Sequence, residues 1–362
     1  MRTVTVLAVI AALVGAAADP ASAVARPAGG GPSWRFTRTA TTNRLVIADV
    51  VSRSVIWAVG GGETMPVTDG SVVVTTDGGR SWRDVTPPGG AMENFRDVMA
   101  FGRDEAVVLS TGDGETEPTQ IYRTVDGGDS WRVVFDDALP AFYNCFAFFD
   151  RRRGLAMSDP VGGKFRIAGT TDGGRSWRVL PDAGMPPALD GEFGRATGTC
   201  LQASGPGYAW FGTSTPAGVD NRVFRTTDGG HTWRVATVPL PGGDDAGVRS
   251  LSFQDRRHGI AVGGPSATDT GQAAVTADGG RTWSPAGSPA GFHNGVTWIP
   301  GKRSTAIAVG PSGSDISTDG GRHWRHFDDA HLLGVDCAPG AGCWAVGRGG
   351  LAARLSLSRG RA

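Results

Sequence analysis

The chain has 362 residues, of which 35 are lysine or arginine and 35 are aspartate or glutamate, so its formal net charge at pH 7 is zero. This balance gives no electrostatic reason to expect binding to nucleic acid or to an anionic membrane surface. The length would suit two or three average domains, so the pattern along the chain decides the domain count.

The N-terminus has the pattern of a secretory signal peptide. An apolar run at 4–18 follows Arg2 and precedes the small-residue site Ala21-Ser22-Ala23, which predicts cleavage after Ala23 and a signal peptide over 1–23. The run is too short for a membrane anchor, and no second apolar stretch reaches membrane-spanning length. We therefore expect a secreted protein without stable membrane insertion, in which residues 24–32 form a flexible segment before the folded domain.

Six copies of one short phrase run through the remaining chain. They are TTDGGRSW at 75–82, TVDGGDSW at 124–131, TTDGGRSW at 170–177, TTDGGHTW at 226–233, TADGGRTW at 276–283 and STDGGRHW at 317–324. Successive aspartates are 49, 46, 56, 50 and 41 residues apart. A period of this size indicates one supersecondary unit repeated around an axis or along a solenoid. We therefore expect one repeat domain over 33–357, followed by a short tail at 358–362.

Each repeat contains short segments with the composition of β-strands. In the fifth repeat these are VRSLSFQD at 248–255, GIAVGG at 259–264 and QAAVTADGG at 272–280, and a fourth segment begins at Trp283. Segments rich in β-branched residues and bounded by glycine and aspartate turns predict a four-stranded antiparallel unit. Helical periodicity is absent outside the signal peptide, so the fold class is all-β.

The two ends of the domain decide the number of units. After the sixth phrase three more strand segments follow without a seventh phrase, whereas Ser33-Trp34-Arg35 near the N-terminus matches the SWR that ends the phrases at 81–83, 130–132 and 176–178. The N-terminal segment is therefore predicted to supply the outer strand of the last unit. This arrangement is a single seven-bladed β-propeller of four-stranded antiparallel blades, closed by the N-terminal strand, and closure removes the exposed strand edges.

The phrase itself has the chemistry of a rigid turn. An aspartate can accept hydrogen bonds from backbone N–H groups just ahead of it, the two glycines accept positive φ, and the tryptophan buries a large apolar face. Six equivalent aspartates spread around a ring cannot converge on one substrate. We therefore predict a structural role for Asp77, Asp126, Asp172, Asp228, Asp278 and Asp319, against the alternative that they are catalytic acids or metal ligands.

These phrases resemble BNR or Asp-box repeats, which are found in sialidases, in xyloglucan-cleaving glycoside hydrolases and in the photosystem II assembly and stability factor family. WAVGGG at 57–62, NRVFRTTDGG at 221–230 and HGIAVGG at 258–264 most resemble the last group and its bacterial, non-photosynthetic relatives. The resemblance implies a β-propeller and, by analogy with the assembly factors, a scaffold role. It does not imply a particular activity, because activity depends on the site and not on the fold.

In a propeller, the loops into the first strands and those between the second and third strands open on one face, and the phrase turns lie on the other. Binding residues concentrate on such loops. On the open face we predict a ligand site drawn from Arg96, Tyr143, Asn144, Lys164, Arg195, Arg249, His293, Asn294 and Asp315. Asp159 and Glu192, each in a glycine-rich loop, are the candidate catalytic pair, because glycosidic cleavage needs two carboxylates. Solvated loop polarity is the alternative for each residue.

Metal and cofactor signals are weak. The loop GDGETEP at 112–118 has three alternating carboxylates, but it matches no complete calcium loop, and a solvated turn explains it better. No HExxH motif or Cys/His cluster predicts zinc, and no dinucleotide fingerprint is present. We therefore expect no metal and no cofactor.

Four cysteines in an exported chain favour disulfides. Cys337 and Cys343 flank a natural hairpin turn, Ala-Pro-Gly-Ala-Gly, and are expected to pair. Cys145 and Cys200 fall at equivalent positions of consecutive repeats. They form either a second bond between neighbouring inner strands or two buried thiols, and the bond is the preferred prediction.

The functional prediction is a binding or scaffold module, a monomeric propeller that binds a protein or a polysaccharide ligand and no nucleic acid. The alternative is a glycoside hydrolase or polysaccharide lyase that uses paired carboxylates. A sialidase fits poorly: Phe165-Arg166-Ile167-Ala168 imitates that family's Phe-Arg-Ile-Pro but leads straight into a phrase, and only three tyrosines exist in the chain to supply the nucleophile.

Overall fold

The computed structural model describes residues 31–61, 69–90, 93–112, 118–137, 141–195 and 199–357. The predicted signal peptide, most of the segment at 24–32 and the tail at 358–362 lie outside these residues, as do the three carboxylates of the 112–118 loop. Within the described part of the chain, no helix is long and apolar enough to cross a membrane.

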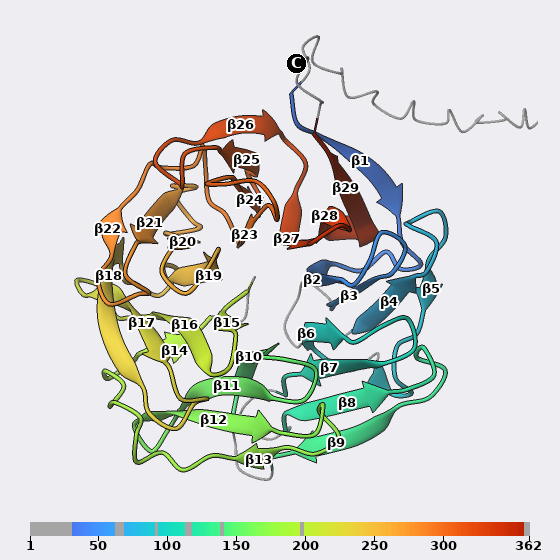
Figure 1. The fold of residues 1–362 in the computed structure, drawn as a ribbon, viewed down its shortest axis with the longest axis horizontal. Helices are drawn as coiled ribbons and strands as arrows, with labels where there is room; N and C mark the ends of the chain where they lie inside the picture. Colours follow the sequence, from blue (N-terminus) through green and yellow to red (C-terminus); the bar gives the residue numbers. More distant parts are fainter. Residues whose placement is uncertain are drawn as a thin grey trace, which may run out of the picture.

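The strands form seven antiparallel sheets around one axis, with the inner strands at the centre (Figure 1). The first blade consists of β2 (Leu45–Val50), β3 (Ile56–Gly60), β4 (Ser71–Thr75) and β5 (Arg83–Asp84). The second consists of β6 (Phe95–Ala100), β7 (Ala106–Ser110), β8 (Gln120–Thr124) and β9 (Arg132–Asp136). The third consists of β10 (Tyr143–Phe148), β11 (Gly154–Val161), β12 (Lys164–Thr170) and β13 (Arg178–Val179). The fourth blade is β14 (Phe193–Gly194) and β15 (Leu201–Ser204), which share the inner position, then β16 (Tyr208–Ser214), β17 (Asp220–Thr226) and β18 (Arg234–Pro241).

The last three blades complete the ring. The fifth blade consists of β19 (Val248–Phe253), β20 (Gly259–Gly263), β21 (Gln272–Thr276) and β22 (Ser284–Pro285). The sixth consists of β23 (Gly295–Trp298), β24 (Ala306–Gly310), β25 (Gly313–Ser317) and β26 (Arg325–Asp328). The seventh consists of β27 (Leu332–Ala338), β28 (Gly342–Gly347) and β29 (Leu351–Ser356), with β1 (Ser33–Arg38) as its outer strand. A single 3-10 turn, η2 (Arg348–Gly350), separates β28 from β29. The predicted seven-bladed propeller is confirmed.

The N-terminal strand closes the ring, as predicted. β1 pairs antiparallel with β29, from Ser33 opposite Ser356 to Arg38 opposite Leu351. Trp34 is buried, and its indole N–H donates to Ser314 Oγ of the sixth blade at 2.9 Å. The strand that completes the seventh blade therefore also anchors it to the sixth.

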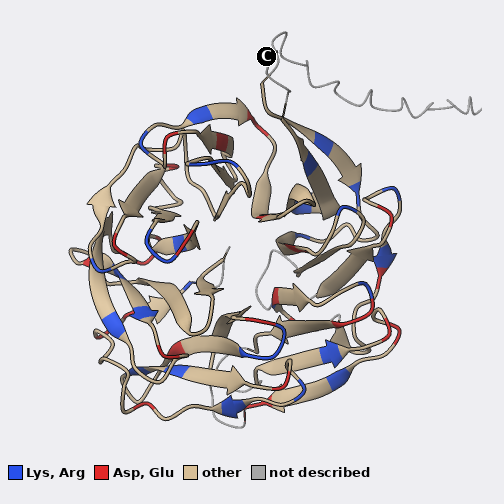
Figure 2. Cartoon of the chain, viewed as in Figure 1, with Lys and Arg blue, Asp and Glu red and all other residues tan. Residues whose placement is uncertain are grey.

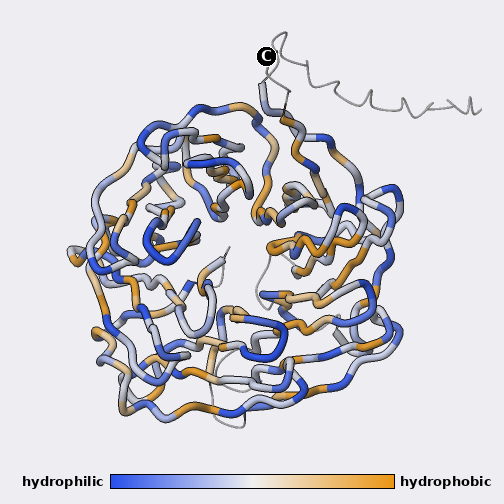
Figure 3. The backbone as a smooth tube through the Cα atoms, viewed as in Figure 1, coloured by the Kyte–Doolittle hydropathy of each residue, from blue (hydrophilic) through white to orange (hydrophobic). Residues whose placement is uncertain are grey.

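The hydrophobic core lies between blades. The buried apolar residues form clusters that span neighbouring blades, for example Trp57 with Tyr122 and Leu155 with Phe224. Figure 3 shows apolar strand segments alternating with polar turns around the ring. Because each blade has one sheet and no second layer of its own, its faces can be buried only against its neighbours.

Each DGG phrase forms the same turn between a third and a fourth strand. In the third blade, Oδ1 of Asp172 accepts from the backbone N–H groups of Arg175 at 2.9 Å and Ser176 at 3.0 Å, and Oδ2 accepts from the Ser176 hydroxyl at 2.6 Å. Gly173 and Gly174 have φ of 79° and 73°. All six aspartates accept from the backbone N–H and from the side chain four residues ahead.

The DGG turns lie on one face, together with the turns between the first and second strands. Gly173 N–H donates to Arg152 O at 2.8 Å, and Gly279 N–H donates to Arg257 O at 2.9 Å. We call this side the turn face. The opposite side, the loop face, carries the loops that lead into the inner strands and the loops between second and third strands.

Side chains on the inner strands tie neighbouring blades together. Carboxylates of Asp336, Asp49 and Asp97 accept from the backbone N–H groups of Val50, Ala100 and Phe146, while Gln202 and Ser250 accept from Phe253 and Val296. Between the third and fourth blades the Cys145–Cys200 disulfide takes this place, with a Cα–Cα distance of 6.1 Å. The structure therefore contains this predicted bond as well as the predicted Cys337–Cys343 bond.

Candidate functional site

The inner strands carry a repeated irregularity at their loop-face ends. In β2, β6, β10, β19 and β27 one extra residue stands opposite the second strand, and these residues are Val46, Arg96, Asn144, Arg249 and Leu333. A β-bulge of this kind takes its extra residue out of the regular alternation and re-aims its side chain. Three of the predicted ligand residues therefore occupy equivalent places around the axis.

Arg195 and Arg249 meet where the fourth and fifth blades adjoin. Arg195 Nη2 donates to the backbone oxygens of Asp244 and Ala246, and Arg249 Nη2 donates to the backbone oxygen of Asp245 at 2.7 Å. The Asp245 carboxylate lies 3.4 Å from Arg249. The Nε atoms of both arginines are buried and have no hydrogen-bond acceptor among the described residues. Neutral backbone carbonyls therefore supply most of the acceptors for this pair.

The electrostatic effect of this crowding appears in the arginine pKa values. Burial and then the charge of Arg195 lower the pKa of Arg249 to about 10. Burial and then the charge of Arg44 lower the pKa of Arg96 to about 10. Arg44 and Arg96 form one pair of like charges, at the first and second blades, and Arg195 and Arg249 form another, at the fourth and fifth blades. We call Arg195 and Arg249 the axial arginine cluster. Like charges at the ends of adjacent inner strands create a positive potential that favours an anionic ligand.

Asp159 lies beside the cluster, between the third and fourth blades. Its Oδ1 accepts from Asn144 Nδ2 at 2.9 Å and from Gly194 N–H at 2.7 Å. Burial raises the pKa of Asp159 to about 6, although the Gly194 N–H, Asn144 and the charge of Arg195 lower it in part. A carboxyl group that titrates near neutral pH can give or take a proton. The buried Oδ1 of Asn144 has no donor among the described residues.

Glu192, the other candidate catalytic carboxylate, is committed to internal contacts. Its side chain is fully buried and forms a two-point ion pair with Arg222. It also accepts from the Thr213 hydroxyl at 2.6 Å and from Leu189 N–H at 2.9 Å. These bonds hold the insertion at 181–196 against the fourth blade, and they leave the carboxylate no free oxygen to act beside Asp159.

Several other predicted ligand residues lie inside blades. His293 Nε2 is 2.8 Å from Asp315 Oδ2, and both side chains are almost completely buried. Tyr143 is buried and donates its hydroxyl to Asp137 at 3.1 Å. Asn294 is buried as well and donates its backbone N–H to Val309 O. The structure does not bring these residues together with the axial arginine cluster by any contact among the described residues.

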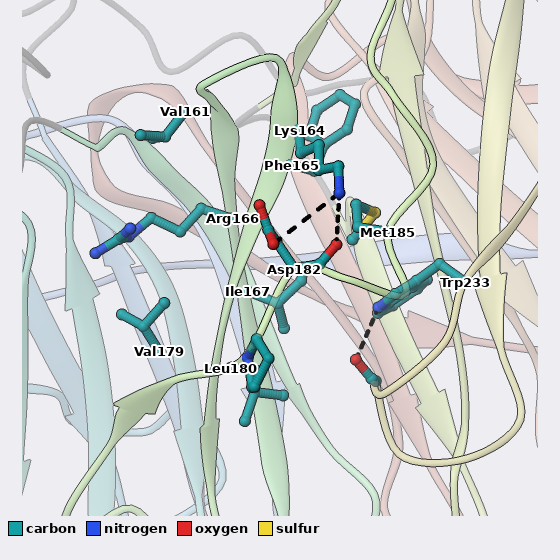
Figure 4. Close-up of a pocket in the computed structure, with 12 residues that line it drawn as sticks. Val161, Lys164, Phe165, Arg166, Ile167, Val179, Leu180, Asp182, Met185 and Trp233 are labelled. Carbon is teal, nitrogen blue, oxygen red and sulfur yellow. Dashed lines mark hydrogen bonds and ion pairs between the residues drawn. The ribbon is translucent and has the colours of Figure 1, made fainter.

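Lys164 belongs to a separate pocket between the third and fourth blades (Figure 4). Its Nζ donates to the backbone oxygen of Asp182 at 3.0 Å. The cavity of about 120 Å³ is lined by apolar residues that include Phe165, Met185 and Trp233 and by the charged residues Lys164, Arg166 and Asp182. Among the described residues no group of three or more histidine, cysteine, aspartate or glutamate side chains could hold a metal ion.

Arg44 was absent from the predicted ligand residues. Arg44 lies one residue before β2, in the first blade. No DGG phrase comes before this blade, so the sequence offered no reference point from which to align Arg44 with the residues of the other blades. The bulges were also missed, because the single extra residue in an inner strand has no composition signal. Aligning the inner strands would have shown Arg96, Asn144 and Arg249 in one column.

No protein-family model matches the sequence, and no curated protein matches it. Solved structures do share the fold. YCF48 bound to D1 peptide is 18% identical, with a TM-score of 0.61 over 89% of this chain and 94% of that chain. YCF48 from Cyanidioschyzon merolae is also 18% identical, with a TM-score of 0.57 over 89% and 98%. The GH74 xyloglucanase from Xanthomonas campestris is 15% identical, with a TM-score of 0.56 over 86% and 59%. At these identities the likeness establishes the propeller fold alone.

Proposed function

We propose that this chain is an exported binding module that recognises a protein or glycan ligand on its loop face, and that the axial arginine cluster receives an acidic part of that ligand. The observation that carries the proposal is the juxtaposition of Arg195 and Arg249, which donate mainly to backbone carbonyls and whose Nε donors are buried without an acceptor among the described residues. The one carboxylate within 4.0 Å of either guanidinium among the described residues is that of Asp245, 3.4 Å from Arg249. Two buried cations that share one nearby carboxylate are costly, and a bound anion offsets that cost.

Two further features support a protein ligand over a glycan. A structure of similar fold is described as YCF48 bound to a D1 peptide, so a propeller of this shape can take a peptide. Neither aromatic ring beside the cluster is fully exposed for a sugar to stack on: Phe292, 5.0 Å from the Arg249 guanidinium, is buried, and Phe193, 4.6 Å from the Arg195 guanidinium, is half-buried.

We also infer that the six DGG turns are Asp-box repeats of the BNR type, that residues 1–23 direct export, and that 33–357 form the mature propeller domain. The turns support the first inference because all six share one hydrogen-bond pattern. Export is supported by two disulfides, which persist in oxidising compartments.

Peptide arrays of graded acidity test the proposal. The mature protein is expected to bind acidic peptides, and Arg195→Gln with Arg249→Gln is expected to weaken binding at least about ten-fold, because charge-assisted hydrogen bonds contribute roughly 1.5–3 kcal/mol each. Arg348→Gln, a single charge removed elsewhere on the loop face, serves as the control and should bind normally. Equal binding by the double variant and its parent would exclude the cluster as the site.

A second candidate function is acid–base catalysis by Asp159, and the observation in its favour is the pKa of about 6. Assays on polysaccharides and aryl glycosides with Asp159→Asn decide it. Turnover by the parent that this variant abolishes would establish an enzyme; absence of turnover by the parent removes the candidate.

A further inference from the structure

The zero net charge of the chain conceals a separation of charge between the two faces. The turn face can be defined as the turns between first and second strands, the DGG turns and the first residue of each following outer strand. It carries 18 arginine and lysine residues and 11 aspartate and glutamate residues. The described loops of the loop face carry 3 basic and 10 acidic residues. Two of these acids, Asp137 and Glu192, are buried and paired with the strand residues Arg166 and Arg222, and the others still outnumber the basic residues. The molecule is therefore a disc with a cationic and an anionic side.

The positive side is exposed. All of the basic residues that define it have exposed side chains. Part of the excess comes from an arginine that follows the buried or half-buried tryptophan at the start of the outer strands, at Arg83, Arg132, Arg178, Arg234 and Arg325. Figure 2 shows blue segments on outer strands around the rim of the ring. An arginine next to an inward tryptophan points outward because side chains alternate along a strand.

The second and third blades neutralise much of their own charge. Arg83 pairs with Asp129 at 2.7 Å, and Arg153 pairs with Asp150 at 2.7 Å. Glu105 lies 3.6 Å from Arg151 and 3.8 Å from Arg175. This sector of the turn face is therefore a network of surface ion pairs.

The fifth and sixth blades do not neutralise their positive charge with ion pairs of this kind. Their turns present Arg256, Arg257, Arg281, Lys302, Arg303 and Arg322, and no ion pair within 4.0 Å joins any of these to an acidic residue of the described chain. The acids of the same turns are Asp255, which pairs with His258, and the DGG aspartates Asp278 and Asp319. We call these six basic residues the cationic sector.

Crowding of like charge extends to the edge of this sector. Burial, then Arg281 and Arg234, lower the pKa of Arg225. A groove of about 320 Å³ lies between the turns of the fifth and sixth blades, lined among others by Gln254, Ser304, Asp319 and Arg322. The other five basic residues of the sector lie outside this groove, so the sector is a spread surface of positive charge and not a pocket for one anion.

We propose that the cationic sector docks this protein on an anionic lipid bilayer, with headgroup phosphates as the bound groups. The basic residues are spread over one side of a disc, which matches a flat surface, and the acidic loop face is repelled and points away from the membrane. The tryptophans of the DGG phrases are buried or half-buried, so they offer no surface on which the bases of single-stranded nucleic acid could stack. Attachment of this kind is peripheral and requires no apolar segment in the bilayer.

Sedimentation of the mature protein with vesicles tests the proposal. We expect binding to phosphatidylcholine vesicles that contain phosphatidylglycerol, no binding to phosphatidylcholine alone, and release at high salt, which screens exposed charges. Replacing Arg257, Lys302 and Arg303 by glutamine should weaken binding by about 100-fold, since each basic residue near an anionic surface contributes roughly five-fold. These turn residues face solvent, so the variant should keep the melting temperature of the parent.

The control removes the same charge from the opposite face, through Arg38→Gln, Lys164→Gln and Arg348→Gln, and should bind vesicles as the parent does. Equal losses in the two triple variants would mean that net charge, not the sector, drives attachment, and would overturn the proposal. Tighter binding to duplex DNA than to anionic vesicles at the same salt, or complete competition by inorganic phosphate at millimolar levels, would also overturn it. Because vesicles contain no peptide, the result is independent of ligand binding on the loop face.

Discussion

Asp97 lies in the interior between the second and third blades, where its carboxylate accepts the backbone N–H of Phe146 at 2.9 Å. Burial raises its pKa to about 7, against the lowering by the N–H groups of Phe146 and Val98. The raised value means that folding favours the protonated form. Its stabilising effect is complete below the unfolded pKa near 4 and is lost as the pH rises through about 7.

Asp97→Asn keeps an acceptor for only one of the Val98 and Phe146 N–H groups, but it buries no charge. Relative to the parent, the variant is therefore expected to be more favourable at pH 8 than at pH 4 by roughly 1–3 kcal/mol. Urea denaturation at the two pH values measures the difference. An equal change at both pH values would contradict the raised pKa, and a larger loss at pH 8 would show that the carboxylate is held for its charge.

Asp172 represents the DGG turns. Replacing it by alanine leaves two backbone N–H groups and the Ser176 hydroxyl without their acceptor, and we expect a loss of roughly 1–3 kcal/mol. Thermal unfolding of this variant beside Asp190→Ala, an exposed aspartate of the 181–196 insertion, separates the turn from a general effect of losing a charge. An unchanged melting temperature for Asp172→Ala would contradict the structural role.

At the scale of elements, the inner strands depend on different links at different junctions. Most junctions use a hydrogen bond from an inner-strand side chain, whereas the third and fourth blades are joined by Cys145–Cys200 across a separation of 55 residues. The inner strand of the fourth blade is split into β14 and β15, which both pair with β16. The covalent bond joins the start of the β15 segment to β10 of the third blade.

Removal of this bond by Cys145→Ser and Cys200→Ser is expected to cost about 2–4 kcal/mol, since a cross-link between distant residues mainly restricts the unfolded chain. The Cys337–Cys343 bond spans only 6 residues and is expected to contribute less. Denaturant unfolding of the two double variants compares them, and a larger loss for the shorter loop would contradict the entropic account.

At the scale of the whole molecule, the apolar residues are buried between neighbouring blades, so the stability of the propeller depends on closing the ring. β1 supplies the outer strand of the last blade and buries Trp34 against the sixth blade. Without it, β29 becomes an exposed edge and the last blade loses an apolar side chain from its core.

Deleting residues 31–38 is expected to lower the melting temperature strongly and to cause association through the open edge, as measured by calorimetry and light scattering. A peptide of residues 31–44 added in trans should restore the monomer. Normal stability of the truncated chain, without the peptide, would show that the ring does not need this strand.

The sequence alone determined the repeat, the number of blades and the closing strand, and it predicted the turn chemistry of the DGG aspartates. Those conclusions follow from local chemistry: a turn that needs aspartate and two glycines repeats wherever the backbone repeats, and strand composition is set by alternation within a few residues. The cysteine pair Cys145–Cys200 was also predictable, because equivalent positions of neighbouring inner strands lie close together.

The candidate site was predicted only in part, and the reason is that it depends on contacts between distant residues. Arg96, Asn144, Arg195 and Arg249 were named from loop position, yet the same rule also named His293 and Asp315, which form an internal ion pair. Glu192 looked equivalent to Asp159 until Arg222, 30 residues away, occupied its oxygens. Composition gave a net charge of zero, and only the ring, by sending alternate turns to opposite sides of a disc, separated that charge into a positive and a negative face.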